Sequence, residues 1–494
     1  MPEGIRALII IILLALIVFS ISKKMFSSII PVSTLNRWRN IWITVTLIAF
    51  LAHNFWLYIA LTGFYLYNVG KREPNKIALF FLLLFIIPPI GDYIPGLGGL
   101  QNLFEITHPR LLSLVILLPA FIFSKSNTDS FKFGKTIPDK LLFIFLLIST
   151  ILQLRDTTTT DTLRRGFYIF TDIFLPYYVG SRGLRSIQDI KVASIALVLA
   201  SQIQGVIGVF EYVKHWLLYA SLPDSLGIPR VLGNYMSRGG ELRAMAGLAH
   251  PIIFGLIMVA SIGFFLYISP LIKSKKYRSI GLLTLISGLL VSLSRGPWIG
   301  AVLLIISFSA TGKNPIKRIF QTIIIGVLFI GMLNIIPGGA KYYNLLPYLG
   351  TTQSENIEYR EKLVTNSMIV IGKYPIFGSA NYLETPEMQE MIQGEGIIDV
   401  VNSYIGIALN FGYFGLSLFL GLFFYILLRI YKIMKKLPNK DSEEFLLGRC
   451  LLSITIAVLV IIATASSIGI IPYFYWTLAG IGVAYIQLTK SKVT

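Results

Sequence analysis

The sequence predicts an all-α, polytopic integral membrane protein with about 12–14 transmembrane helices and one large outside loop. Of its 494 residues, 55% are apolar and only 14% are charged, whereas soluble domains carry about 25% charge. The apolar residues form continuous runs, which predicts helices rather than the alternating strands of a membrane barrel. One Cys and four His exclude a disulfide framework and a thiolate metal centre, so no metal or cofactor is expected.

About fourteen runs are predicted to span the membrane, because a span needs about 20 apolar residues, or fewer where its ends are buried in protein. They are 7–22, 41–69, 77–95, 110–124, 140–154, 166–180, 189–210, 245–269, 279–294, 296–310, 318–336, 402–429, 445–465 and 468–488. One unbroken apolar stretch is divided at Arg295. The predicted organisation is a transmembrane bundle at 1–336, a large loop at 337–401 and C-terminal transmembrane helices at 402–494.

Lysine and arginine in the short loops indicate the orientation. With both termini inside, the cytoplasmic segments collect more than half of the 43 Lys and Arg residues. Much of the net charge of +19 is then an orientation signal, and no nucleic-acid partner is expected. One segment disagrees, because residues 23–40 carry Lys23, Lys24, Arg37 and Arg39 yet fall outside.

Two predicted outside segments are long, residues 211–244 and residues 337–401. Loops of such length without structure are uncommon and often functional. Within the second, residues 354–372 have helical patterning and are predicted to form a helix near the membrane. We expect this second loop to cover an outward-facing cavity.

Four arginines on the predicted outside are candidates for binding an anion: Arg238, Arg243, Arg295 and Arg360. An arginine at membrane depth is costly without a partner, and guanidinium binds phosphate bidentately. Arg295 stands before a Gly-Pro pair that opens a helix, whose N-terminus adds oriented N–H groups. For any one arginine an ordinary interfacial role is favoured; for Arg243 and Arg295 together, phosphate binding is favoured.

Other polar residues have weaker signals. Asp172 falls within a predicted span, where a proton or ion relay and a structural partner are both open. Asp92 and Glu105 flank a Gly-rich outside loop and are predicted to be solvated. His250 precedes a helix start and is expected to be packed and hydrogen-bonded rather than a base, while His53 is expected to face the bundle from inside a span.

Three sequence blocks carry a family resemblance. The first is Arg-Ala-Met-Ala-Gly-Leu-Ala-His-Pro at 243–251, and the second is Leu-Ser-Arg-Gly-Pro-Trp at 293–298. The third runs from Arg360 through Tyr-Pro-Ile-Phe-Gly at 374–378 to the segments 402–404 and 410–416. In their order, with a large loop between the second and third, they resemble the O-antigen ligase / O-antigen polymerase superfamily of integral membrane glycosyltransferases.

The resemblance implies a GT-C-like fold and transfer of a glycan from undecaprenyl diphosphate on the outer face of the cytoplasmic membrane. It implies an active site that faces the periplasm beneath the 337–401 loop and works without a metal. By the same resemblance, Arg243 and Arg295 are catalytic residues that hold the diphosphate. The implied substrate-binding residues are Arg238, Arg360, Asn402, Tyr404 and His250. Implied partners are the undecaprenyl-diphosphate-linked oligosaccharide, the lipid bilayer, a flippase and chain-length regulator proteins.

One position departs from the family pattern. Ligases have a histidine before the Asn of their His-Asn-x-Tyr segment, where this chain has Val401. Asp399 and Glu395 are the nearest carboxylates and are the candidate general bases; solvated loop acids are the alternative. The missing histidine favours a repeat-unit polymerase over a ligase. A lipid-linked oligosaccharide flippase is a more distant alternative, since transporters tend to show internal repeats that this sequence lacks.

Overall fold

The computed structural model describes residues 2–96, 102–125, 131–229, 236–333, 335, 343–344, 354–393 and 396–490. In chain order its helices are α1 (Glu3–Phe26), α2 (Val32–Leu51), α3 (Phe55–Arg72), α4 (Lys76–Leu83), α5 (His108–Leu112), α6 (Leu118–Lys125), α7 (Ile137–Asp156), α8 (Thr159–Ile169), α9 (Leu175–Arg182), α10 (Ile187–Lys214), α11 (Leu222–Ser225), α12 (Pro251–Ile268), α13 (Lys275–Val291), α14 (Arg295–Ala310), α15 (Pro315–Leu333), α17 (Ser354–Lys373), α18 (Pro386–Gln389), α19 (Ser403–Lys436), α20 (Glu443–Ile462) and α21 (Ile471–Lys490). Two short antiparallel hairpins pair β1 (Gly91–Pro95) with β2 (Asn102–Thr107) and β3 (Ser237–Arg238) with β4 (Glu241–Leu242).

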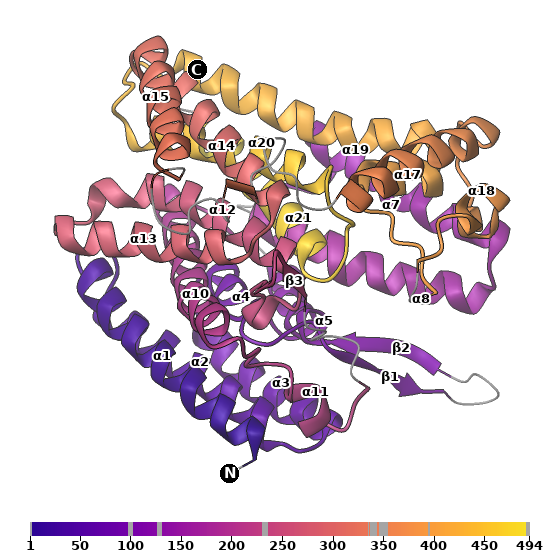
Figure 1. Cartoon of the computed structure of the whole chain (residues 1–494), viewed down its shortest axis with the longest axis horizontal. Coiled ribbons are helices and arrows are strands. Elements are labelled where there is room, and N and C mark those ends of the chain that lie inside the picture. Colours follow the sequence, from indigo (N-terminus) through magenta and orange to yellow (C-terminus); the bar gives the residue numbers. More distant parts are fainter. Residues whose placement is uncertain are drawn as a thin grey trace.

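The all-α membrane class is confirmed. In the described part of the chain, six helices are long and apolar enough to cross a membrane, namely α1, α7, α10, α12 with its continuation to Leu271, α19 and α20. Two shorter apolar helices cover His108–Phe123 and Arg295–Ala310. Most of the long helices run side by side, with α1, α2 and α3 on one flank and α14, α15 and α19 on the other (Figure 1). Between these flanks α12 is almost entirely buried, and so is the middle of α10.

The predicted single span at 41–69 is wrong, because the structure has two helices there. The chain breaks between α2 and α3, where His53 takes a positive φ of 52°. The side chain of Asn54 then caps α3 by accepting a hydrogen bond from the Leu57 backbone N–H at 3.0 Å. The apolar run hides this cap, and His53 lies exposed in the turn rather than inside a span.

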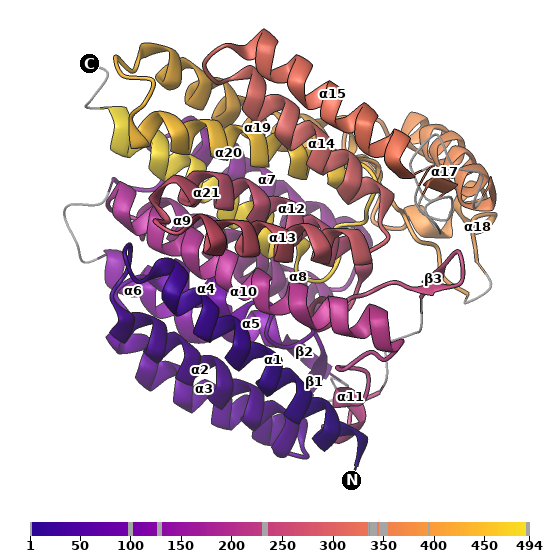
Figure 2. The ribbon, with the colours of Figure 1, turned by 60° about the vertical axis from the view of Figure 1, so that its left-hand side comes forward.

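The extra turn changes the topology at the N-terminus. Arg37 at the start of α2 forms an ion pair with Glu73, just after α3, at 2.8 Å, so both lie at one end of the molecule. At the other end, Trp216 donates a hydrogen bond from Nε1 to Glu3 at 3.0 Å. The N-terminus therefore lies on the same side as the 211–244 segment, and the expectation that they lie on opposite sides is wrong. Figure 2 shows the N- and C-termini at opposite ends. The basic residues of 23–40 no longer disagree with the orientation rule.

One other predicted span is wrong, and one predicted division is confirmed. The predicted span at 77–95 is helical only as α4, and its second half enters the β1–β2 hairpin after Pro88 and Pro89, which cannot continue a helix. The predicted division at Arg295 is confirmed. Helix α13 ends at Val291, Leu293 takes a φ of 44°, and α14 begins at Arg295.

The described part of the 337–401 loop contains helices α17 and α18, which pack against the start of α19. A small apolar core joins them, formed by Leu363, Val370, Ile371, Met388, Met391, Ala408 and Leu409. The predicted helix at 354–372 is confirmed as α17. In Figure 2, α17 and α18 lie on the same side of the molecule as β3.

Candidate active site

The break between α13 and α14 holds two of the predicted arginines through its backbone and its serine. Arg243 donates a hydrogen bond from Nη2 to the hydroxyl of Ser294 at 2.9 Å. Arg238 donates from Nη1 to the carbonyl of Leu293 at 2.5 Å. Arg295, the first residue of α14, follows directly. The predicted pair Arg243 and Arg295 is therefore brought to one place, together with Arg238.

The β3–β4 hairpin presents Arg238 and Arg243 to this break. Its two-residue turn is Gly239-Gly240, with φ values of 59° and 80°, which is the conformation that two-residue hairpin turns require and that glycine allows. The Arg243 N–H then donates to the carbonyl of Met236 at 2.9 Å, and the next N–H, of Ala244, donates to Val291 at the end of α13. The hairpin is thus fastened to α13 beside Arg243.

Arg360 reaches the same break from α17. Its guanidinium donates to the carbonyl of Thr464 at 3.4 Å. The hydroxyl of Thr464 lies where a side chain on Gly296 would stand, so the second residue of α14 must be small. Arg360 and the start of α14 therefore approach the same residue from two sides.

The arginines act on one another electrostatically. Burial lowers the pKa of Arg243 to about 9, with a further lowering by the positive charges of Arg238 and Arg360. Burial also lowers the pKa of Arg238 to about 10, with further lowering by Arg295 and Arg360. Crowding of like charges in a partly buried place is unfavourable unless an anion joins them. The site is therefore a concentrated positive field with the geometry to accept a multivalent anion.

A buried carboxylate of α10 positions the loop that follows Arg243. The sequence did not indicate this role. Glu211 accepts hydrogen bonds from the backbone N–H groups of Ala246 at 2.8 Å, Met245 at 3.2 Å and Leu218 at 3.1 Å. Gln204, two turns earlier on α10, accepts from the Gly247 N–H at 2.8 Å. A carboxylate near the end of an apolar run was the only available sequence signal.

His250 is packed and hydrogen-bonded, as expected. Its Nδ1 accepts a hydrogen bond from the Ile252 N–H at 3.2 Å and so caps α12. Burial lowers the pKa of His250 to about 4, and the charge of Arg243 lowers it further. The imidazole is neutral at neutral pH, and its capping nitrogen is not available as a base.

Asp399 and His250 line one cavity of about 660 Å³. Asp399 accepts a hydrogen bond from the hydroxyl of Ser466 at 2.6 Å, and its backbone carbonyl accepts from Tyr359 at 3.1 Å. Asp399 does not cap α19, because Asn402 is the N-cap of that helix. Glu395, the other candidate base, lies outside the described residues.

The segment that resembles the Asn-x-Tyr motif forms the start of α19. The side chain of Asn402 accepts hydrogen bonds from the N–H groups of Tyr404 at 2.9 Å and Ile405 at 3.2 Å. The hydroxyl of Tyr404 donates to the carbonyl of Leu459 at 2.6 Å, which ties α19 to α20. The side chains of these two predicted substrate-binding residues thus form hydrogen bonds within the protein, at the edge of the site.

The Tyr-Pro-Ile-Phe-Gly block docks into a kink in α19. Gly412 has a φ of 65° inside that helix, and the Tyr413 N–H donates to the carbonyl of Pro375 at 2.8 Å. A side chain on Gly412 would collide with the carbonyl of Ile376, and one on Gly378 with that of Leu409. These motif glycines are therefore needed for close backbone contact between the large loop and α19.

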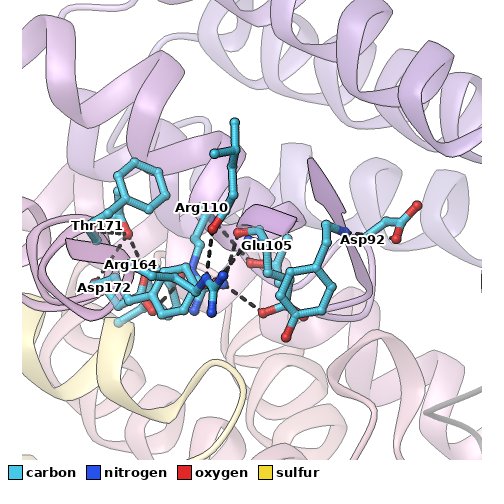
Figure 3. A network of polar contacts seen from close by, with 12 residues as sticks. Asp92, Glu105, Arg110, Arg164, Thr171 and Asp172 are labelled. Atoms are coloured by element: carbon cyan, nitrogen blue, oxygen red, sulfur yellow. Dashed lines mark hydrogen bonds and ion pairs between the residues drawn. The ribbon is translucent and has the colours of Figure 1, made fainter. Parts of the chain in front are cut away.

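Arg110 sits between two carboxylates beside the cavity (Figure 3). It forms ion pairs with Asp172 at 3.0 Å and with Glu105 at 2.8 Å, and Tyr473 also donates to Asp172. Asp172 is thus a structural partner, one of its two predicted roles. The prediction that Glu105 is a solvated acid is wrong, because it pairs with Arg110 and lines the same cavity as Asp399.

The remaining predicted acid of this region has a local contact. Asp92 accepts a hydrogen bond from the Tyr93 N–H at 2.8 Å, at the start of the β1–β2 hairpin. Figure 3 shows its side chain apart from the Arg110 network.

Comparison with protein families gives a match to part of the chain. Residues 280–420 match the model of the O-antigen ligase family, a region that includes Arg295, Arg360, Asp399 and the glycine kink of α19. The block at 243–251 precedes the matched region. No curated protein matches the chain. The match covers less than a third of the chain, and together with the resembling blocks and the helical membrane architecture it supports a relationship to the O-antigen ligase/polymerase superfamily.

Proposed function

We propose that this protein is a glycosyltransferase that polymerises undecaprenyl-diphosphate-linked glycan repeat units on the outer, periplasmic face of the cytoplasmic membrane. The observation that carries the proposal is the convergence of Arg238, Arg243, Arg295 and Arg360 on the α13–α14 break. A pyrophosphate-linked lipid carries the negative charge that this group of arginines attracts. An O-antigen ligase, which moves finished glycan to a lipid A core or another acceptor, is the second candidate.

The reaction breaks the bond between the donor sugar and the diphosphate. As that bond breaks, negative charge builds on the phosphate oxygens, and preorganised cations lower the energy of the transition state. Arg243 is held by Ser294 before any substrate binds, so little reorganisation is needed. The positive end of the dipole of the 16-residue helix α14 adds to the same field.

The acceptor is a sugar hydroxyl, which must lose its proton as the new bond forms. Asp399 is our candidate for the base, because it lines the 660 Å³ cavity and is oriented by Ser466. Glu105 lines the cavity as well, but its carboxylate is engaged in the ion pair with Arg110. Val401 carries no group that accepts a proton, in line with a base displaced to Asp399.

The partners follow from this role. They are the lipid-linked oligosaccharide, the bilayer, a flippase that delivers the donor and a chain-length regulator. Transport itself is a less favoured function, because the basic residues of the site gather at one end of the bundle rather than at mid-depth.

Purified protein reconstituted with lipid-linked repeat units tests the proposal. Lengthening of the lipid-linked glycan supports a polymerase. Movement of the glycan to a second lipid acceptor, without lengthening, would assign a ligase. Translocation of labelled donor with neither product would assign transport and overturn the enzyme.

A further inference from the structure

A second cavity, of about 430 Å³, lies at the end of the molecule opposite the candidate active site. It lies between α3, α6, α9 and the start of α10, where Asp189 lines it. The other end of α10 carries Glu211, which holds the loop beside the candidate active site. The 28 residues of α10 correspond to about 42 Å at 1.5 Å per residue, the thickness of a bilayer with its headgroups. The two cavities therefore lie at the two faces of the membrane.

The lining of this second cavity is basic on one side and apolar on the other. Four lining residues are basic, Lys71, Lys76, Arg182 and Arg185, against the single acid Asp189. The other wall is Val115, Ile116, Pro119, Ala120 and Phe123. Phe123 is 69% exposed, as expected of a side chain that faces lipid.

Two of the four basic lining residues already form polar contacts with other groups of the protein. Arg182 forms a fully buried ion pair with Asp139 at 2.6 Å, yet its Nε has no hydrogen-bond partner among the described residues. Lys76 donates to the carbonyls of Gly70 and Glu73.

The other two basic residues, Lys71 and Arg185, are exposed, and within the described ranges no carboxylate forms an ion pair with either. Lys71 lies 3.9 Å from the centre of the Tyr67 ring, and the Arg185 backbone N–H, not its guanidinium, binds Asp189 at 3.0 Å. The cavity thus presents uncompensated positive charge beside an apolar wall.

We propose that this cavity binds an anionic phospholipid of the leaflet at that end, independently of the glycan site. The phosphate lies against Lys71 and Arg185, and an acyl chain follows the apolar wall past Ala120. Lysine and arginine recognise phosphate through charge-assisted hydrogen bonds, and basic pockets between transmembrane helices suit anionic headgroups. A free phosphate ion would use the basic side alone and leave the apolar wall without a ligand.

Native mass spectrometry of the delipidated protein tests this site, with phosphatidylglycerol or phosphatidylcholine added in detergent. The double variant Lys71→Gln, Arg185→Gln should weaken phosphatidylglycerol binding by about tenfold or more, because each basic residue near an anionic lipid contributes several-fold. Phosphatidylcholine binding should not change.

The matched control is Lys435→Gln, since Lys435 also follows a tyrosine by four residues and lies 4.9 Å from the Tyr431 ring. It lies at the same end of the bundle, because the pair of Lys191 with Glu443 at 2.8 Å joins the start of α10 to the start of α20, just after α19 ends. Equal loss of phosphatidylglycerol binding in this control would assign the effect to general surface charge and overturn the site.

A second variant, Ala120→Phe, fills the apolar wall without changing charge and should also reduce phosphatidylglycerol binding. Unchanged binding in both variants overturns the proposal, as does equal affinity for the two lipids in the wild type. Inorganic phosphate at the same concentration should not compete; effective competition would assign a free-anion site instead. Because every readout is lipid binding, failure here leaves the glycosyltransferase proposal standing, and the converse holds.

Discussion

Arg243 donates a hydrogen bond from Nη2 to the Ser294 hydroxyl at 2.9 Å, so it is fixed to the residue that precedes Arg295. This contact joins two sequence blocks that are 50 residues apart from first residue to first residue, and it makes one site of them. The geometry of this site also predicts which substitutions will lower turnover and which will lower the stability of the fold.

The buried acceptor Glu211 should be a positioning residue. Glu211→Gln replaces one carboxylate oxygen by an NH₂ group, so the side chain can no longer accept both from Leu218 with one oxygen and from Met245 and Ala246 with the other. We expect a loss of about 1–3 kcal/mol in stability and a fall in kcat. Thermal unfolding and single-turnover kinetics measure the two effects. Glu361→Gln, at an exposed position on α17, is the matched control and should change neither.

His250 should make stability depend on pH. Its folded pKa of about 4 is below its ordinary value of 6.5, so the unfolded chain binds more protons between these values. Stability is then fully present above pH 6.5 and is lost as the pH falls toward 4, by at most about 3 kcal/mol. His250→Asn keeps a capping acceptor but does not titrate. Thermal unfolding from pH 7.5 to 4.5 should therefore fall less steeply in this variant; identical slopes would contradict the assignment.

Asp399 should determine the acidic limb of the pH–rate profile. Asp399→Asn keeps the shape and the contact with Ser466 but removes the basic oxygen, so turnover should fall far more than donor binding, and the acidic limb should disappear. Glu395→Gln is the comparison from the same loop. Full activity in both variants would indicate a mechanism without a protein base in this loop.

Gly412 should be required for docking of the large loop. Gly412→Ala places a side chain at a φ of 65° and against the carbonyl of Ile376, so we expect a loss of at least about 1–2 kcal/mol. Gly406→Ala is the control in the same helix, because its side chain would meet only Val400, at 3.9 Å. A melting temperature that falls equally in both variants would contradict the clash.

The sequence predicted the features that depend on composition and on strong local signals. The break at Arg295 was predictable because Gly296 and Pro297 mark a helix start, and α17 because its pattern is amphipathic. The turn at His53 was hidden, since a single Asn54 cap within an apolar run has little weight.

Long-range contacts were beyond local reasoning. Nothing near Glu211 in the sequence indicates that it accepts from Met245, and nothing near Asp172 indicates that Arg110 is its partner. These pairings are set by how the helices pack, which no local pattern encodes. The fold was likewise needed to show that Arg238 and Arg360 lie beside Arg243 and Arg295.

The most direct test of the account is the turnover of lipid-linked repeat units by Arg295→Ala and Arg243→Ala. Each loses a charge-assisted phosphate contact of about 2–4 kcal/mol in the transition state, so we predict a fall of about 30- to 1,000-fold, with poor rescue by lysine, which lacks the bidentate fork. Arg164→Ala is the control, because Arg164 pairs with Asp161 at 2.5 Å and donates to the β2 backbone; its activity should persist. Near wild-type turnover in both site variants, with intact folding, would contradict the central claim that these arginines hold the diphosphate.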